Sequence, residues 1–302
     1  MAQPVRHYHY LNKQNMKITS LLIISIILMV SCGRTSSTTR EETSNKNVTD
    51  NWKLGVAFWT FHTFDLPEAL AKIDSTGLDY IESVTFFNAG PELGDSLIGN
   101  LSPAGLAKVK EMVDSKGLRM ESMYVGGDET IDSWKKQLDV AKFFGVQYVT
   151  GEPPVRMWDS IDSLLGVYNL RMAIHEHWKG VSAYWHPDSV LAAIDGHSNF
   201  GACADLGHWP KSGVNPLDGV KRLEGHILGI HLKDIAEYNN TTIQDVRVGT
   251  GVVDFPAVFA ELKRQNFSGH IYIERDAETV PSNLPSVLET IEYYNDEIAK
   301  LR

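Results

Sequence analysis

The sequence has few cysteines, little positive charge and no long apolar run, and each shortage excludes a class of protein. Its 302 residues include two cysteines, Cys32 and Cys203, in unlike surroundings, so we expect no structural disulfide. The formal net charge is −10, and residues 1–50 hold six Lys/Arg against three Asp/Glu, which leaves the remainder at −13. Nucleic-acid binding needs a basic face, so we expect no nucleic-acid partner. The apolar run at residues 21–30 is too short to span a bilayer comfortably as a helix.

The N-terminal segment has the composition of an export signal. The apolar residues 21–30 follow Lys13 and Lys17 and precede small residues, as in a secretory signal. Cys32, soon after the apolar run, resembles the lipidated cysteine of a bacterial lipoprotein. We therefore expect residues 1–32 to be a lipoprotein-type signal peptide and the protein to be an exported, membrane-tethered lipoprotein on the periplasmic side or the cell surface. An uncleaved membrane anchor is the alternative.

A polar stretch separates this signal from the rest of the chain. Residues 33–51 are rich in Ser and Thr and hold too little apolar surface to fold, which predicts a flexible linker. Residues 52–302 then form the predicted folded domain. The chain's hydrophobic content of 43% is ordinary for a protein with a sizeable core.

The predicted domain alternates strands with helices. Caps mark the helix ends: Asp65 precedes one helix, Ser102-Pro103 begins the next, and Gly117 ends it. The predicted strands are 53–60, 78–84, 118–125, 146–150, 170–175, 200–205, 227–231 and 270–274. The predicted helices are 66–75, 103–116, 131–144, 188–194, 216–223, 255–265 and 284–301, with a less clearly helical connection at 157–169.

Eight strand–helix repeats in about 250 residues predict a single-domain α/β fold, the (β/α)8 TIM barrel. A doubly wound open sheet is the alternative, but no Gly-rich phosphate fingerprint follows the first strand. Chemistry in such a barrel lies at the carboxyl ends of the strands.

Five successive predicted strands end in ionisable residues, which is a stronger signal than one charged loop. In chain order these are Glu152; His175, Glu176 and His177; Asp205 and His208; His231, Lys233 and Asp234; and Glu274 and Asp276. Histidines and carboxylates at neighbouring strand ends predict a metal site.

The alternation of side chains along a strand narrows the ligands. His175 shares a face with Ala173, whose small side chain suits the crowded barrel interior. The same alternation turns Asp205, His231 and Glu274 inward. These four predicted ligands suit one divalent ion, with Mn²⁺, Zn²⁺, Co²⁺ or Fe²⁺ favoured over Mg²⁺.

The chain resembles the xylose-isomerase-like barrels, a family of sugar isomerases and epimerases that also includes apurinic-site endonucleases. The resemblance covers about residues 53–301 and is carried by YVTGEP, RMAIHEHW, GACADLGHW, GIHLKD, VGTGVVDF and HIYIERD. Family members bind one divalent metal through residues on strands 5 to 8. The resemblance implies metal roles for Asp205, His231 and Glu274, and substrate contact for His208.

Strand 5 departs from this pattern. Epimerases carry a metal-binding Glu where this chain has His175, which resembles a subgroup with a His-x-His run. The strand-5 ligand is therefore His175 or Glu176. The paired Glu ligands of epimerases also move protons, and the resemblance implies that Glu152 or Glu176 replaces the missing one.

We expect proton abstraction beside the carbonyl of a sugar, with the metal polarising that carbonyl. Glu274 or Glu152 moves the proton, and Lys233 neutralises or protonates the oxygen. The structural alternatives are an ion pair between Lys233 and Asp234 or Glu274, a rigid turn at Glu152, and an orienting role for His208.

Substrate contacts are predicted from residues near the strand ends, namely Trp59, Glu176, His177 and Trp209. Sugars stack on aromatic faces, although each tryptophan could instead be core. Export and the lack of a basic cluster favour a carbohydrate without phosphate.

Three other functions stay open. Elimination or hydrolysis of a 3-keto-glycoside begins with the same proton abstraction, and its product is a released aglycone rather than an isomer. A tethered sugar-binding protein would bind without turnover. Phosphodiester cleavage requires more metal ligands and a basic face.

Overall fold

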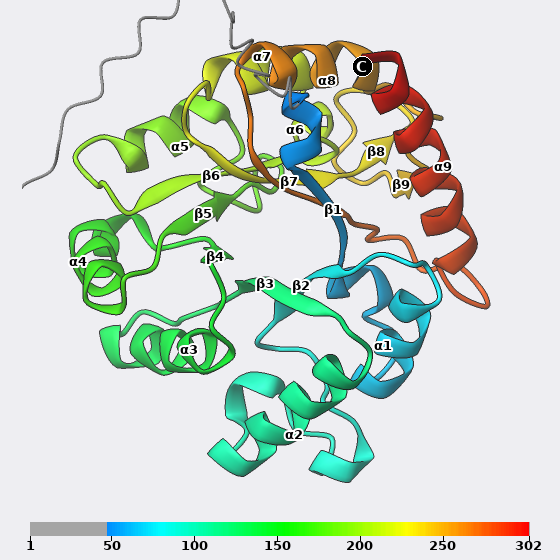
Figure 1. Ribbon diagram of the computed structural model, residues 1–302. Coiled ribbons are helices and arrows are strands. Elements are labelled where there is room, and N and C mark those ends of the chain that lie inside the picture. The colour runs from blue at the N-terminus through cyan, green and yellow to red at the C-terminus, as the bar shows by residue number, and fades with distance from the viewer. Residues whose placement is uncertain (1–46, 302) are drawn as a thin grey trace, which may run out of the picture. The chain divides into compact units, whose positions relative to one another are not determined.

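The computed structural model describes residues 47–301, which fold around one closed parallel barrel (Figure 1). Neighbouring strands follow the order β1-β10-β7-β6-β5-β4-β3-β2, and the circle closes between β2 and β1. The barrel strands are β1 Trp52–Ala57, β2 Tyr80–Val84, β3 Arg119–Tyr124, β4 Tyr148–Gly151, β5 Met172–His175, β6 Phe200–Asp205, β7 Ile227–Leu232 and β10 Gly269–Ile273. The predicted (β/α)8 barrel is confirmed.

Helices surround the barrel (Figure 1). They are α1 Leu66–Asp74, α2 Pro103–Ser115, α3 Ile131–Phe144, α4 Trp158–Tyr168, α5 Pro187–Ile194, α6 His208–Lys211, α7 Pro216–Arg222, α8 Phe255–Arg264 and α9 Leu284–Leu301. Short 3-10 turns are η1 Val48–Asn51, η2 Phe58–Phe61, η3 Pro91–Leu93, η4 Ile98–Asn100 and η5 Val155–Met157. A small antiparallel pair, β8 Asp234–Ile235 with β9 Asp245–Val246, follows β7.

The local signals read from the sequence account for several helix ends. The Asp65 side chain accepts the backbone N–H of Glu68 at the start of α1, and Ser102 accepts that of Gly105 in α2. Gly117 follows α2 with a φ of 68°, a left-handed conformation that glycine adopts without strain.

Two predicted elements differ from the structure. The first strand ends at Ala57 instead of residue 60, because residues 58–61 turn as η2 and bury Phe58 and Phe61. This turn carries Trp59 to the mouth of the barrel. The connection after β4, expected to be only weakly helical, forms the regular helix α4.

The interior of the barrel is closed below the mouth by side chains. Tyr148 packs there against the small Ala173 and Cys203, and Cys203 is a buried free thiol. The ring of His270 lies 5.8 Å from that of Tyr148. A Cβ at Gly229 would collide with the Tyr148 hydroxyl. The polar side chains at the mouth of the barrel therefore lie directly above a layer of closely packed side chains.

The predicted signal, residues 1–32, lies outside the described residues, as does most of the predicted linker. The end of that linker, Val48–Asn51, forms η1, in which Thr49 is buried. Among residues 47–301, no helix is both long and apolar enough to cross a membrane.

Candidate metal centre

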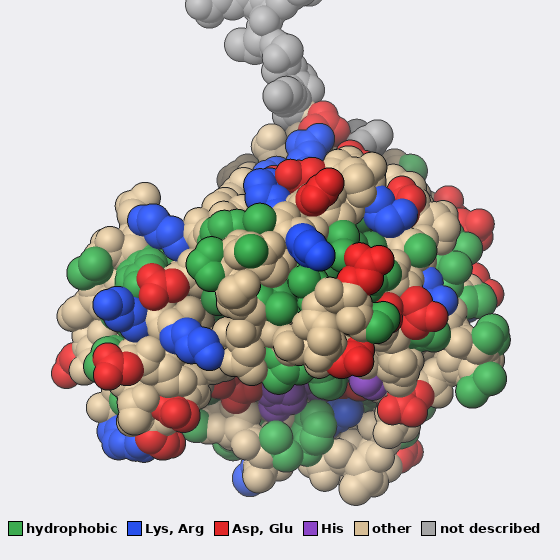
Figure 2. Space-filling view, turned by 90° about the horizontal axis from the view of Figure 1, so that it is seen from below, with side chains coloured by type: hydrophobic (Ala, Val, Ile, Leu, Met, Phe, Trp, Pro, Cys, Tyr) green, Lys and Arg blue, Asp and Glu red, His purple; other side chains and the backbone are tan. Residues whose placement is uncertain are grey.

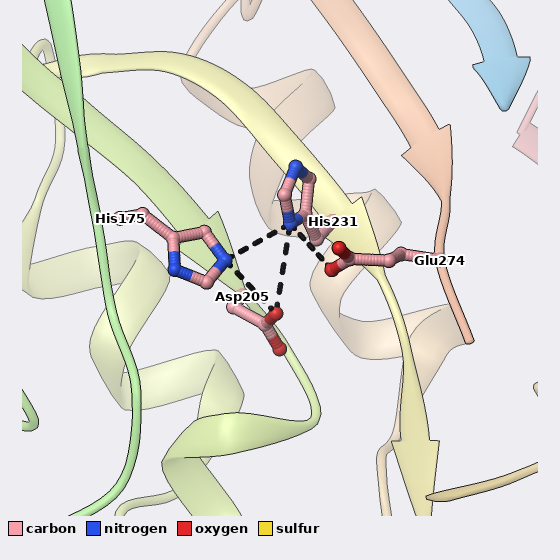
Figure 3. A group of neighbouring side chains, drawn as sticks. All are labelled: His175, Asp205, His231 and Glu274. Atoms are coloured by element: carbon pink, nitrogen blue, oxygen red, sulfur yellow. Dashed lines mark hydrogen bonds and ion pairs between the residues drawn. The ribbon is translucent and has the colours of Figure 1, made fainter. Parts of the chain in front are cut away.

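Four side chains converge at the carboxyl ends of β5, β6, β7 and β10 (Figure 3). His231 Nδ1 lies 2.7 Å from Glu274 Oε2 and 3.1 Å from His175 Nε2. Asp205 Oδ2 lies 3.4 Å from His175 Nε2 and 3.6 Å from His231 Nδ1. Each residue offers one ligand atom, and these atoms all lie within 4.8 Å of one another. The structure thus brings together the four ligands predicted from the sequence.

The hydrogen bonds of the two carboxylates support a cation at this point. Asp205 Oδ1 accepts the backbone N–H groups of Gly207 at 3.0 Å and His208 at 2.9 Å. Asp205 Oδ2 and Glu274 Oε2 are buried, and within the described part of the chain their polar neighbours are the imidazole nitrogens of the cluster and the ammonium of Lys233. Buried carboxylate oxygens need positive charge nearby, and one ammonium is shared here between two carboxylates. Two such oxygens facing two imidazole nitrogens form a donor set that fits a divalent cation.

Nearby positive charges keep the carboxylates ionised. Burial acts to raise the pKa of Asp205, but His208 and Lys233 outweigh it and hold that pKa well below its ordinary value. Burial also acts to raise the pKa of Glu274, and the charges of His231 and Lys233 bring it down to about 2. Both side chains therefore carry the negative charge that a metal ligand requires.

The raised pKa of His231 indicates that a metal ion would displace a proton from its imidazole. Burial alone would lower this pKa. The neighbours Cys203, Glu274 and Glu82 outweigh burial and raise it well above the ordinary value. A proton on the imidazole competes with a metal for the same nitrogen, so metal binding releases protons here.

Glu82, in the middle of β2, is part of this site and was missed in the sequence analysis. Its Oε1 lies 2.7 Å from His231 Nε2, and its Oε2 accepts the hydroxyl groups of Ser122 at 2.8 Å and Thr150 at 2.7 Å. A carboxylate on the far nitrogen fixes the tautomer of a metal-binding imidazole. Glu82 therefore leaves His231 Nδ1 to face the cluster. The signal in the sequence is an acidic residue inside the otherwise uncharged strand β2.

Lys233 is fully buried beside the cluster. Its ammonium lies 2.9 Å from Asp276 Oδ2, 3.0 Å from Glu274 Oε2 and 3.3 Å from Asp205 Oδ2. It also donates to Nε2 of His208 at 3.1 Å. Burial acts to lower the pKa of Lys233, but the surrounding carboxylates raise it well above the ordinary value. The side chain is a fixed positive charge at the site.

Asp234, proposed as an ion-pair partner of Lys233, has another task. Its carboxylate accepts backbone N–H groups from Ile235, Gly249, Gly251 and Val253. Burial raises the pKa of Asp234 even though these hydrogen bonds favour its charged form. Asp234 thus anchors the loop that leads into α8.

Glu152 lies on the β4 and β5 side of the site. Its carboxylate contacts Nδ1 of His177 and accepts the hydroxyl group of Ser182, and Tyr124 donates to it at 3.2 Å. His175 Nδ1 lies 3.8 Å away. Burial acts to raise the pKa of Glu152, but the nearby imidazoles of His175 and His177 outweigh it and lower the pKa. Glu152 thus holds the His177 ring through Nδ1. The other ring nitrogen, Nε2, remains available to a group in the cavity that His177 lines.

A cavity of about 270 Å³ opens above the cluster, and we call it the inner cavity. Its lining residues are Ala57, Trp59, Glu82, Val84, Phe86, Tyr124, His175, His177, His208, Lys233, Glu274 and Asp276. Figure 2 shows histidine side chains within a hollow on this face, with hydrophobic side chains beside them.

Two predicted substrate contacts lie elsewhere. Glu176 points away from His175, as strand alternation requires, and its buried carboxylate accepts the backbone N–H of Asp205 at 3.0 Å. Burial raises the pKa of Glu176 well above its ordinary value. Trp209 is fully buried and packs over Gly219 in the helical layer. Neither side chain lines the inner cavity, whereas Trp59 and His177 do.

The sequence and the structure are similar to those of known proteins. An inosose dehydratase of Clostridium botulinum is 27% identical over 139 residues, which are 41% of this chain and 44% of that relative. The match thus spans less than half of the curated relative. A solved uncharacterised protein from Parabacteroides distasonis is 32% identical, covers 82% of this chain and 99% of its own, and superposes with a TM-score of 0.65.

A third similarity concerns the fold alone. The IOLI protein, solved with a bound zinc atom, is 19% identical, with a TM-score of 0.67 and coverage of 82% of this chain and 98% of its own. The family described as xylose isomerase-like TIM barrel matches residues 70–299. This match covers most of the described barrel and all four converging side chains, and the chain therefore belongs to the xylose isomerase-like TIM barrel family.

Proposed function

We propose that this protein is a metal-dependent enzyme of the sugar isomerase and epimerase type, which removes a proton next to the carbonyl of a non-phosphorylated sugar. The observation that carries the proposal is the joint placement of three features on one cavity. These are the four-residue cluster, the buried ammonium of Lys233, and the imidazole of His177 held by Glu152. Proton abstraction beside a carbonyl needs a cation near the oxygen and a base near the carbon.

His175, Asp205, His231 and Glu274 would hold one divalent cation. When bound, that ion polarises the carbonyl and stabilises negative charge on its oxygen. The donor set favours Mn²⁺, Zn²⁺, Co²⁺ or Fe²⁺ over Mg²⁺.

His177 is the side chain best placed to move the proton. Its Nδ1 faces the Glu152 carboxylate, so Nε2 is the nitrogen that can accept a proton from the substrate. Glu152 does not line the inner cavity and would act by fixing the ring of His177. Glu274, which does line the inner cavity, is the second candidate, after His177, to take a proton from the substrate. Lys233 would stabilise the charge that develops on the substrate oxygen.

Isotope exchange tests this proposal. The metal-loaded protein is incubated with neutral and oxidised sugars in D₂O, and deuterium entering the carbon beside the carbonyl is followed by NMR. We expect exchange that depends on the metal and is lost in His177→Ala. Sugar binding without any exchange would instead identify a tethered binding protein.

Elimination or hydrolysis of a 3-keto-glycoside is a second candidate. It is favoured by the similarity to an inosose dehydratase and by His175, which replaces the strand-5 carboxylate expected of an epimerase. The first step is the same proton removal, after which a leaving group departs. Mass spectrometry of the product separates the two: isomerisation keeps the substrate mass, whereas elimination releases water or an aglycone.

We further propose that the enzyme acts outside the cytoplasm as a lipid-anchored protein. The apolar residues 21–30 and Cys32 support this, and the acidic domain favours a carbohydrate over a nucleic acid. The unaltered protein should incorporate labelled fatty acid in the membrane fraction, and Cys32→Ala should abolish that incorporation. An unaltered protein that stays in the membrane fraction without taking up the label would indicate an uncleaved anchor.

A further inference from the structure

A second hollow adjoins the inner cavity, and we call it the outer hollow. It measures about 460 Å³ and shares Trp59, His177 and Asp276 with the inner cavity. Its other lining residues are Trp178, Lys211, Thr241, Thr242, Ile243 and Gln244. A ligand that reaches the metal cluster with one part can therefore extend into the outer hollow with another.

Lys211, in α6, is the unusual group in the outer hollow. The residue as a whole is 4% exposed and lines the outer hollow, and among residues 47–301 its ammonium has neither a hydrogen-bond acceptor nor an ion-pair partner. It lies 4.2 Å from the centre of the Trp178 ring. A cation–π contact of this kind contributes about 0.5–2 kcal/mol. Such a contact is weaker than pairing with a carboxylate in a desolvated site, so the ammonium stays available to a ligand in the hollow.

The other lysine near the site is satisfied by protein carboxylates. Lys233 has three carboxylates within 3.3 Å. One of them is Asp276, which lines the outer hollow as well and is already paired with Lys233. The charge of Lys211 is thus left for a group that is not part of the described chain.

We propose that the outer hollow binds a carboxylate of the substrate through Lys211, so that the substrate is an acidic sugar derivative such as a uronic-acid-containing saccharide. This inference rests on the proposed function, because it assumes that the reacting sugar ring lies in the inner cavity. Tryptophan faces at Trp59 and Trp178 and the hydroxyl groups of Thr241 and Thr242 suit the remainder of a sugar unit.

The charges in the outer hollow favour a monoanion over a phosphate dianion. Lys211 is the one cationic side chain among the residues that line it, and no arginine is among them. Asp276 contributes a carboxylate to the same hollow, and its Oδ2 lies 2.9 Å from the ammonium of Lys233. A ligand carboxylate with a single negative charge can pair with Lys211, whereas a dianion would be repelled more strongly by Asp276.

Calorimetry on the full metal-loaded protein tests the proposal. The probes are matched pairs that differ in a terminal carboxylate: glucose and glucuronate, galactose and galacturonate, cellobiose and cellobiouronate. We expect at least one acid to bind about tenfold or more tightly than its neutral partner. Lys211→Met keeps the apolar stem over Trp178 and should reduce this ratio to about one while the affinity for the neutral sugar stays within twofold.

Lys179→Met is the matched control. Lys179 also lies over a tryptophan ring, 5.1 Å from the centre of Trp185, but it is exposed and does not line the outer hollow. The control should keep the preference for the acid. An acid that binds through the metal would keep its preference in Lys211→Met, and this outcome would overturn the assignment, as would equal binding of acid and neutral sugar in every pair.

Thermal unfolding without ligand distinguishes a binding role from a structural one. If Lys211 is kept for a ligand, Lys211→Met should unfold at the same temperature as the unaltered protein or higher, because an unpaired buried charge is removed. A clear fall in the unfolding temperature would show that Lys211 serves the fold and would count against the proposal. Because these readouts require no turnover, they stand apart from the deuterium exchange that tests the proposed reaction.

Discussion

The inner cavity has two unlike walls. The charged wall comes from the ends of β5, β6, β7 and β10 and holds the metal cluster with Lys233. The aromatic wall comes from the β1, β2 and β3 side and consists of Trp59, Phe86 and Tyr124. Its rings contact one another edge to face, at 5.8 Å between Trp59 and Phe86 and 5.6 Å between Phe86 and Tyr124.

This difference matches the two kinds of surface on a sugar. A sugar ring presents a carbonyl and hydroxyl groups at its edge and C–H groups on its faces. The charged wall can act on the edge, whereas the aromatic wall can hold a face without adding polar contacts. We therefore expect changes in the charged wall to alter metal binding and kcat, and changes in the aromatic wall to alter KM.

Asp205→Asn should have the largest effect. The amide keeps the oxygen that accepts from Gly207 and His208, so the turn is preserved, but it removes the negative oxygen from the cluster. A metal contributes several kcal/mol to such a reaction, which corresponds to a loss of about a thousandfold or more in kcat. Metal content by atomic spectroscopy and turnover are the measurements.

Asp188→Asn is the control for that variant, because Asp188 is exposed and pairs with Arg222 on the surface. Full metal content and turnover in Asp205→Asn would contradict the assignment of metal binding and kcat to the charged wall.

Glu152→Gln should have the next largest effect. The amide lacks the negative charge that stabilises His177 once the imidazole has accepted a proton. We therefore expect kcat to fall about a hundredfold with metal affinity unchanged. Steady-state kinetics and metal titration check this. Loss of metal in this variant would instead show that Glu152 supports His175, which lies 3.8 Å away.

Glu82→Gln tests a residue that belongs to the β2 side but serves the charged wall. Removal of the carboxylate from His231 should weaken metal binding about 10–100-fold, as for other groups that orient metal-binding imidazoles. Nitrogen NMR of the imidazole should show a changed tautomer.

Thr150→Val is a milder companion, because it removes one hydroxyl group from the other oxygen of Glu82 and leaves the contact with His231 in place. Unchanged metal affinity in Glu82→Gln would mean that Glu82 supports the fold of the barrel and has no part in metal binding.

Trp59→Ala should have the smallest effect. An aromatic contact contributes about 0.5–1.5 kcal/mol, so we expect KM to rise about 2–10-fold with kcat and metal content nearly unchanged. A large loss of kcat would remove the distinction between the walls. Phe143→Ala, an exposed aromatic change on the outer helix α3, is the control and should leave KM unaltered.

Much of the site could be predicted because strand alternation is a local rule. His175, Asp205, His231 and Glu274 each follow an apolar run, and the barrel brings their strand ends together. The first three share a strand face with small or glycine residues, whereas Glu274 shares its face with Tyr272. Glu176 obeys the same alternation and points away from the cavity, so its predicted substrate contact ran against that rule. Trp209 lies beyond the end of β6, where the direction of a side chain depends on how the loop turns. Helix ends were predictable for a similar local reason, as Asp65 and Ser102 show.

The sequence by itself determined the barrel, because its apolar periodicity and its helix caps act within a few residues of each position. It also determined which chemical groups end the strands. The tertiary structure alone decided that Glu82 meets His231 across 149 positions of the chain, and that Lys211 lies over Trp178 with no ion pair to any residue in the range 47–301. The physical reason is that hydrogen bonding and desolvation depend on distances in space, which closure of the barrel sets and spacing along the chain does not.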